Sequence, residues 1–295
     1  MAVRTITLFC SYFHFIILLN MKTIIVPVDF SSTSINTLNY AVDFAAALKA
    51  DISIIHIYNF PVSFGEMAIS PDMIKGELEV KWKALEKMKT NLLAKNEKIN
   101  VHIALKEGDF INELNSYCNA LQPYAVIMGA SNKDGLEKFL LGSATKAAVK
   151  HIKYPVVIVP PGYLYKHIFK VGLACDMDNV ENSLPVDEIK RLVTGFNAVL
   201  HILHVDRKNL KENNAGNLVD EIAFLQSAFA DLNPEFHFAK NSNIDKAVKD
   251  FVEENNLAVL IVVPKNHSFP ENAFHKSQSK QLLADASIPI ISIHE

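Results

Sequence analysis

The chain has 295 residues, of which 49% are hydrophobic, and its formal net charge is −3 at pH 7. This length and apolar content suffice for two packed domains of about 130–150 residues each. The small net charge, without a basic run, argues against a nucleic-acid-binding protein and against attachment to an anionic membrane. Three widely separated cysteines without metal-ligand spacing are typical of free thiols in a reducing compartment, so we expect a cytoplasmic protein.

The first 20 residues do not have the pattern of a folded element. An apolar run from Thr5 to Leu19 follows Arg4, as in a signal peptide, but no small-residue cleavage site precedes Met21. The run is also short for a membrane span, which needs about 20 residues. We interpret residues 1–20 as a non-native extension and Met21 as the true start. A signal or anchor segment and a structural arm are the alternatives.

From Met21 onward, short strands alternate with helices. The strands are almost continuously apolar and rich in Val and Ile, which is typical of a parallel sheet covered on both faces. They are predicted at residues 23–28, 51–57, 100–105, 124–128 and 155–159. The helices between them are predicted to begin near Ser31, to span 71–94, to follow Gly108-Asp109 and to span 143–151. This order predicts an open, doubly wound α/β sheet.

The same order of elements returns after Tyr163. A strand at 169–176 again ends in an aspartate, Asp176, and the strands at 198–205, 257–263 and 288–293 match counterparts in the first unit. We therefore predict two tandem Rossmann-like units, each with a five-stranded parallel sheet. Domain 1 spans 21–160, a short linker spans 161–168, and domain 2 spans 169–295.

A glycine-containing loop lies between the fourth strand and the fourth helix of the first unit. It runs from Gly129 to Gly142, and the backbone N–H groups at 143–145 begin the helix. Such N–H groups, together with the helix dipole, favour a bound phosphate. Asp29 ends the first strand at the same edge of the sheet. The pattern therefore predicts a nucleotide crevice between Asp29 and the loop.

These residues resemble the universal stress protein family. That family carries Gly-x2-Gly-x9-Gly-Ser/Thr after its fourth strand, and the corresponding positions here are Gly129, Asn132, Gly142 and Ser143. The family also places an aspartate within Pro-Val-Asp-x-Ser at the end of strand one, which reads Pro27-Val28-Asp29-Phe30-Ser31 here. The resemblance extends from Met21 to the C-terminus, strongly in the first unit and weakly in the second.

The resemblance implies an adenine nucleotide as ligand: ATP, ADP or AMP, with or without Mg²⁺. The base and ribose would lie beside Pro27, Val28 and Asp29, and the Asp29 carboxylate would accept hydrogen bonds from them. The backbone of Ile57 would meet the adenine edge, and Met128 would pack on the base. The phosphates would approach the backbone of Gly129 and Gly142 and the helix start at Ser143, Ala144 and Thr145.

Each of these assignments has a structural alternative that the sequence leaves open. Asp29 and Ser143 are residue types that cap helices. Ile57 and Met128 at strand ends are typical core residues, and Gly129 and Gly142 could serve turn geometry alone. At Asn132 the family has glycine. Asparagine tolerates left-handed backbone angles, but its side chain adds bulk that could either bind the ligand or block the site.

The second unit lacks the glycine motif. Its corresponding loop contains Pro264, which has no N–H, and Lys276 takes the place of Gly142 opposite Ser277. We interpret this unit as a degenerate site. The alternative is a cationic pocket for another anion, built from Lys265, His267, His275 and Lys276. A metal shared by His201 and His204 is not expected, because residues three apart on a strand face opposite sides.

Three functions follow from this pattern. The favoured one is a non-catalytic stress-response sensor or regulator that binds a nucleotide in domain 1 and acts through a protein partner of unknown identity. A slow ATPase, with Mg²⁺ held by Asp29 or Asp176, ranks lower because the sequence offers no evident general base. A nucleotide-independent scaffold is the third. The two units are expected to form an intramolecular pseudo-dimer by pairing strands 155–159 and 289–293, which removes exposed edges. A homodimer of the whole chain is a further possibility.

Overall fold

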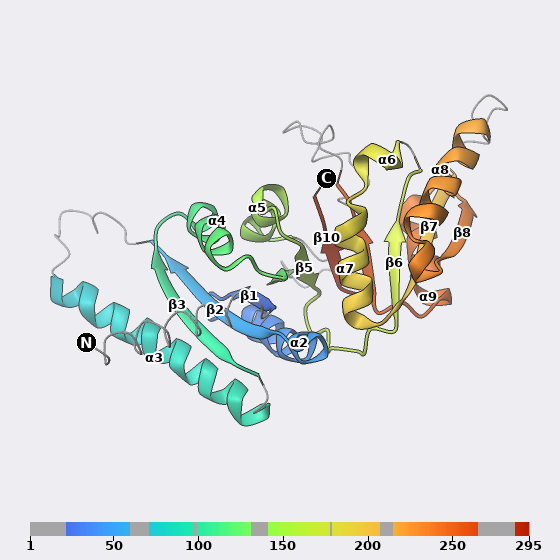
Figure 1. Ribbon diagram of the computed structural model, residues 1–295. Helices are drawn as coiled ribbons and strands as arrows, with labels where there is room; N and C mark the ends of the chain where they lie inside the picture. Colours follow the sequence, from blue (N-terminus) through green and yellow to red (C-terminus); the bar gives the residue numbers. More distant parts are fainter. Residues whose placement is uncertain are drawn as a thin grey trace, which may run out of the picture.

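The computed structural model describes residues 22–59, 71–96, 99–130, 141–177, 179–206, 215–264 and 287–294. Several sequence-based predictions lie outside these residues: the extension at 1–20, the start at Met21, Asn132, and the second-unit positions Lys265, His267, His275, Lys276 and Ser277. The described residues form a continuous ten-stranded sheet with helices on both faces (Figure 1).

The first half of the chain contributes five parallel strands in the spatial order β3-β2-β1-β4-β5. Their chain order confirms the predicted alternation of strands and helices. The elements are β1 (Thr23–Pro27), α2 (Ser32–Leu48), β2 (Asp51–Tyr58), α3 (Pro71–Lys95), β3 (Val101–Glu107), α4 (Phe110–Leu121), β4 (Ala125–Gly129), α5 (Ser143–His151) and β5 (Val156–Val159).

The second half repeats this arrangement in the order β10-β9-β6-β7-β8. Its elements are β6 (Lys170–Ala174), α6 (Val180–Ser183), α7 (Val186–Phe196), β7 (Val199–Asp206), α8 (Ala215–Ala228), the short 3₁₀ helix η2 (Ala230–Leu232), β8 (Glu235–Lys240), α9 (Ile244–Glu254), β9 (Val259–Val262) and β10 (Ile290–Ser292). Among the described helices, the counterpart of α2 differs from α2 itself, because it is divided into α6 and α7. Pro185 lies at the break, where it lacks a donor N–H and disfavours a helical conformation for Leu184.

The two halves join through an antiparallel pair of strands. Ile290, Ile291 and Ser292 of β10 pair with Ile158, Val157 and Val156 of β5. This confirms the predicted pairing of the last strands, and it turns the two expected sheets into one. Because each half is parallel within itself and the joint is antiparallel, the carboxyl ends of the strands point to opposite edges of the sheet in the two halves.

Each face of the sheet carries its own hydrophobic core. One core packs β-strand side chains against α2, α3, α7 and α8, with Leu38, Leu85, Ile189 and Leu225 among its buried members. The other packs against α4, α5 and α9, with Leu114, Val149 and Val248 among its buried members. Both cores run across the joint between the halves, which explains why apolar residues occupy both sides of the central strands.

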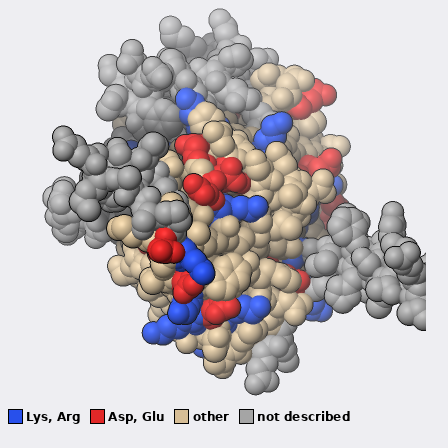
Figure 2. All heavy atoms as spheres, turned by 90° about the vertical axis from the view of Figure 1, so that its left-hand side faces the viewer, with Lys and Arg blue, Asp and Glu red and all other residues tan. Residues whose placement is uncertain are grey.

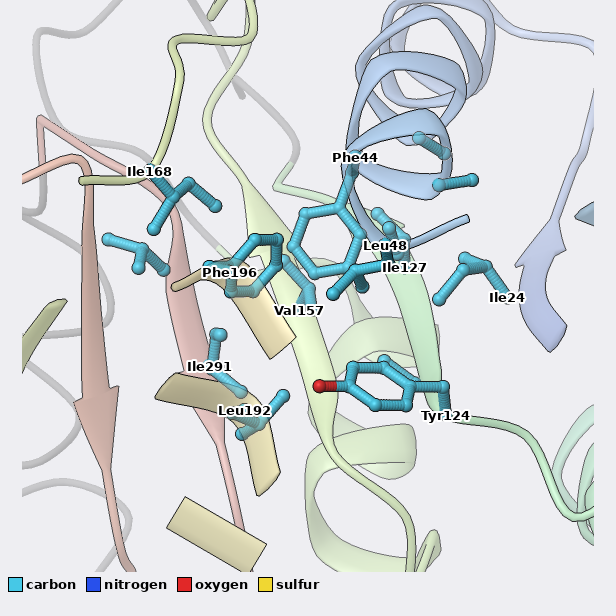
Figure 3. Close-up of a cluster of buried hydrophobic side chains, with 14 of the residues drawn as sticks. Ile24, Phe44, Leu48, Tyr124, Ile127, Val157, Ile168, Leu192, Phe196 and Ile291 are labelled. Atoms are coloured by element: carbon cyan, nitrogen blue, oxygen red, sulfur yellow. The ribbon is translucent and has the colours of Figure 1, made fainter. Parts of the chain in front are cut away.

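Helices α2 and α7 also pack directly on each other between the halves (Figure 3). Phe44 and Phe196 meet edge to face, with ring centroids 4.9 Å apart. The Arg191 guanidinium lies 3.8 Å from the centroid of the Tyr124 ring and donates to the Tyr124 carbonyl. The Tyr124 hydroxyl in turn donates to the Arg191 carbonyl at 2.7 Å. A Cβ at Gly195 would collide with that hydroxyl, so glycine permits this close approach.

The surface of the first half carries both signs of charge. Figure 2 shows the end of the molecule at the left of Figure 1, where basic and acidic side chains are interspersed among the described residues. Lys81 and Glu77 of α3 form one such pair at 2.9 Å. Among the described helices, none combines the length and apolar composition that crossing a membrane requires.

Candidate nucleotide site

The turn after β1 is held by a short chain of hydrogen bonds. Asp29 Oδ1 accepts from the Ser31 N–H at 3.0 Å and from the Ser31 hydroxyl at 2.5 Å. Ser31 Oγ then accepts from the Ser34 N–H, which makes Ser31 the N-cap of α2. Asp29 therefore supports the capping residue and is not itself the cap.

Asp29 is exposed and carries its charge at neutral pH. Partial burial alone would raise the pKa of its carboxyl, but the hydrogen bonds from Ser31 outweigh this and lower the pKa below its ordinary value. An ionised carboxylate accepts hydrogen bonds through both of its oxygens, from hydroxyl or amino groups among others. This is the chemistry that the sequence analysis assigns to Asp29.

The same turn contains a backbone conformation that is rare for a bulky residue. Phe30 has φ +64°, in the left-handed region. Its ring packs on the His56 imidazole with centroids 4.4 Å apart, and His56 Nδ1 lies 2.7 Å from the Val28 carbonyl oxygen. Strain of this kind persists only where neighbouring contacts enforce it. His56 and Phe30 thus shape the end of β1, a role that sequence reasoning missed.

His56 is neutral in the folded chain. Burial lowers the pKa of its imidazole, and in the neutral form Nδ1–H donates to Val28. The other nitrogen, Nε2, is buried without a hydrogen-bond partner among the described residues. The recurrence of histidine before an aliphatic residue, His56-Ile57 and His204-Val205, was the only sequence signal for this arrangement.

The residues expected beside the base occupy the ends of β1, β2 and β4. Val28 is buried and its N–H donates to the Ile55 carbonyl at 2.9 Å, so its backbone belongs to the sheet. Ile57 is half-buried, and alternation along β2 directs its backbone groups toward the β1 side, beyond the point where β1 ends. Pro27 is half-buried at the last position of β1. The Met128 side chain is buried in the core on the α5 face of the sheet, which agrees with the alternative that Met128 is a core residue.

Gly129 is required by packing against α2. A Cβ there would lie 2.6 Å from Thr33 Cγ2 and 2.6 Å from Thr37 Oγ1. Its φ is not in the left-handed region, so the turn-geometry explanation is wrong for this residue. The Gly129 carbonyl accepts from the Thr145 hydroxyl at 3.0 Å. This bond ties the start of α5 to the end of β4.

The N-terminus of α5 is exposed and bare. Gly142 is its N-cap, with φ −57° and ψ 158°, angles that any residue can adopt, and it offers no side chain to the helix. Ser143 is therefore the first helical residue, and the proposal that it caps the helix is wrong. Ser143 and Ala144 are exposed, whereas Thr145 is buried. No acidic residue lies in the first turn, so the positive end of the helix dipole is not neutralised from within the helix.

These two groups of residues meet at the switch point of the sheet. β1 pairs with β2 on one side and with β4 on the other, and its crossovers leave in opposite directions. The ends of β1 and β4 therefore lie next to each other, where a crevice outside the carboxyl ends is expected in open α/β sheets. The anionic turn at Asp29 and the bare start of α5 flank this position.

Comparison with known proteins agrees with this arrangement. The model of the universal stress protein family matches residues 20–160. The similarity to the universal stress protein family therefore covers residues 20–160. A universal stress protein of Methanocaldococcus jannaschii is 28% identical over 140 residues, which are 47% of this chain and 81% of that protein.

Solved structures extend the likeness of fold to both halves. The crystal structure of a universal stress protein from Archaeoglobus fulgidus superposes with a TM-score of 0.71 over 93% of this chain and 99% of its own, at 17% identity. A candidate universal stress protein from Pseudomonas aeruginosa gives a TM-score of 0.63 over 94% of each chain, at 11% identity. At these identities the likeness concerns the fold alone.

The second half of the chain presents different chemistry at its first turn. Glu221 of α8 accepts from the N–H groups of Asn179 and Val180, at 2.9 and 3.0 Å. A carboxylate of the protein thus holds the start of α6. Asp176 lies in the same turn, at the position that corresponds to Asp29. The Glu221 carboxylate at this helix start disfavours a phosphate there.

Proposed function

We propose that the first half of this protein binds an adenine nucleotide in the crevice between β1 and β4. The observation that carries the proposal is the exposed start of α5, where Gly142 leaves the backbone N–H groups of the first turn without a side-chain cap. Such a helix start favours a phosphate. Asp29, ionised and exposed across the crevice, supplies an acceptor for ribose or base donors.

The same geometry favours binding over turnover. The described side chains at the two rims are hydroxyl groups, one carboxylate that also holds a turn, and apolar groups. His56, the nearest imidazole to the turn, uses Nδ1 to hold the Val28 carbonyl. We therefore propose a non-catalytic role, in which ATP, ADP or AMP, with or without Mg²⁺, regulates a surface that a protein partner recognises.

A substitution that adds negative charge at the start of α5 tests this proposal without weakening the helix. We expect Gly142→Asp to fold normally, because aspartate is a good N-cap and the observed angles suit it. Its carboxylate would however repel a phosphate at the same place. The matched control is Asn243→Asp at the N-cap of α9, which adds the same charge to another helix start.

Calorimetric titration with ATP, ADP and AMP, with and without Mg²⁺, gives the readout. We expect Gly142→Asp to weaken binding at least tenfold, a loss of about 1.4 kcal/mol, and Asn243→Asp to bind as the parent does. Equal binding by all three proteins would contradict the proposed site. No binding by the parent at millimolar nucleotide would favour the scaffold function, and release of phosphate from ATP would favour the ATPase.

A further inference from the structure

Three potential metal ligands converge on the outer strand pair of the second half. His201 of β7 lies opposite Glu235 of β8, and His237 is two residues further along β8, on the same face of the sheet. His201 Nδ1 is 3.1 Å from His237 Nε2 and 3.5 Å from Glu235 Oε2. One ligand atom from each residue lies within 4.8 Å of the other two.

These separations match those between ligands of one tetrahedral ion. Zn²⁺ binds histidine nitrogen and carboxylate oxygen at about 2.0–2.2 Å, which places neighbouring ligands of a tetrahedron about 3.3 Å apart. The two distances measured from His201 Nδ1 lie on either side of that value. Two imidazoles and one carboxylate are also a donor set that suits zinc and neighbouring transition metals better than Mg²⁺ or Ca²⁺.

The surroundings hold the first ligand in place. His201 is 1% exposed, whereas Glu235 is 59% exposed at the rim of the cluster. The His237 ring packs on Phe251 of α9 with centroids 5.1 Å apart.

The first half lacks this cluster at the corresponding positions. Ser53 takes the place of His201, and its hydroxyl hydrogen-bonds the Tyr117 hydroxyl at 2.7 Å. His102 and Ala104 occupy the positions of Glu235 and His237. The three positions that carry metal-binding side chains in the second half thus carry a serine, a histidine and an alanine in the first.

We propose that His201 Nδ1, His237 Nε2 and the Glu235 carboxylate bind one divalent transition-metal ion of the Zn²⁺ class. The ion would fasten the edge strand β8 to β7, and its fourth position would face the side of exposed Glu235. Glu235 is the first residue of β8 and His201 the third of β7. The site is therefore near the amino ends of these strands, away from the carboxyl-end crevice proposed for the nucleotide, and it is independent of that function.

The test uses the full chain, stripped of metal with a chelator and titrated with Zn²⁺ alone. We expect one equivalent to bind and to raise the melting temperature, and Co²⁺ to give the visible absorption of a tetrahedral complex. His237→Gln and Glu235→Gln should each weaken Zn²⁺ binding at least tenfold. His102→Gln is the matched control, because it removes a histidine beside Asp51 on the edge strand of the first half and should bind as the parent does.

Thermal melting of each metal-free variant shows whether it folds. If His237→Gln does not fold, Glu235→Gln provides the test on its own, because the Glu235 side chain is exposed and its replacement should not disturb folding. Failure of the parent to bind an equivalent of Zn²⁺ would overturn the proposal. Binding by His237→Gln and Glu235→Gln that equals the parent would also overturn it, because the ion would then reside on other histidines of the chain.

Discussion

The two halves of the molecule share a backbone framework and differ in the chemistry placed on it. In each half the residue after the first strand donates its N–H to the second strand, from Val28 to Ile55 and from Cys175 to Leu203. Two residues later, both turns enter the left-handed region, at Phe30 with φ +64° and at Met177 with φ +51°. The framework was therefore retained where the sheet requires it.

The difference lies in the helix that follows this turn. In the first half Ser31 caps a continuous α2 of 17 residues, whereas in the second half Glu221 holds the start of α6, which has only four. At the end of the neighbouring strand, Gly129 of the first half corresponds to Val263 of the second. The comparison teaches that one fold can keep its strained turn while changing the group that holds the next helix and the residue at the end of the neighbouring strand.

The largest expected effect concerns the contact that joins the halves. Phe44 is fully buried and packs on Phe196 across the joint (Figure 3). Phe44→Ala should lower the free energy of unfolding by about 3–5 kcal/mol, because it removes a large buried ring and leaves a cavity. Phe169→Ala, at a residue 65% exposed, should change it by less than about 0.5 kcal/mol.

Urea unfolding followed by two probes shows whether the halves unfold together. Trp82 is the only tryptophan of the chain and lies on α3, so its fluorescence reports the first half, whereas circular dichroism reports both. We expect the two transitions to coincide in the parent, because the cores are shared. An unchanged midpoint for Phe44→Ala would contradict the role given to this contact.

A smaller effect on stability is expected at Gly129, which is replaced by Val263 at the corresponding position of the second half. Gly129→Ala places a methyl group 2.6 Å from both Thr33 Cγ2 and Thr37 Oγ1, so α2 must move away from β4. Overpacking of this kind costs about 1–3 kcal/mol. Thr33→Ser removes Cγ2 and should recover part of the loss in the double variant, as thermal melting can measure. Equal stability of Gly129→Ala and the parent would show that the contact is not tight.

The smallest effect concerns the pH dependence of stability. Burial lowers the pKa of His56 in the folded state, so the unfolded chain, with an ordinary histidine pKa of about 6.5, binds the proton more readily. The stability that neutral His56 contributes is therefore complete above the pKa of the unfolded state, and it is lost as the pH falls from that value toward the pKa of the folded state. His56→Gln should therefore flatten the dependence of unfolding free energy on pH below about 6.5. An unchanged slope in denaturant melts would show that His56 protonates equally well when folded.

Much of the fold could be predicted because it depends on local patterns. Apolar runs and turn residues placed β1 to β5 to within about two residues, and the repeat located the pairing of β5 with β10. The break between α6 and α7 was not predicted, although Pro185 signals it locally.

The missed features of the candidate sites depend on contacts between distant segments. Gly129 matters because Thr33 and Thr37 approach it, and no spacing in the sequence shows which helix comes close. Likewise, His201 was considered only with His204 on its own strand, whereas its partners Glu235 and His237 lie on the next strand of the sheet. Register between strands is set by the folded sheet, and the sequence alone did not provide it.

The central claim is that only the first half binds a nucleotide. Isothermal titration of the full chain with ATP and Mg²⁺ tests it most directly through the stoichiometry. We expect one equivalent per chain, because the start of α5 is bare while the Glu221 carboxylate holds the helix start in the second crevice. Two equivalents, or one equivalent that survives Gly142→Asp, would contradict the difference between the halves on which this account rests.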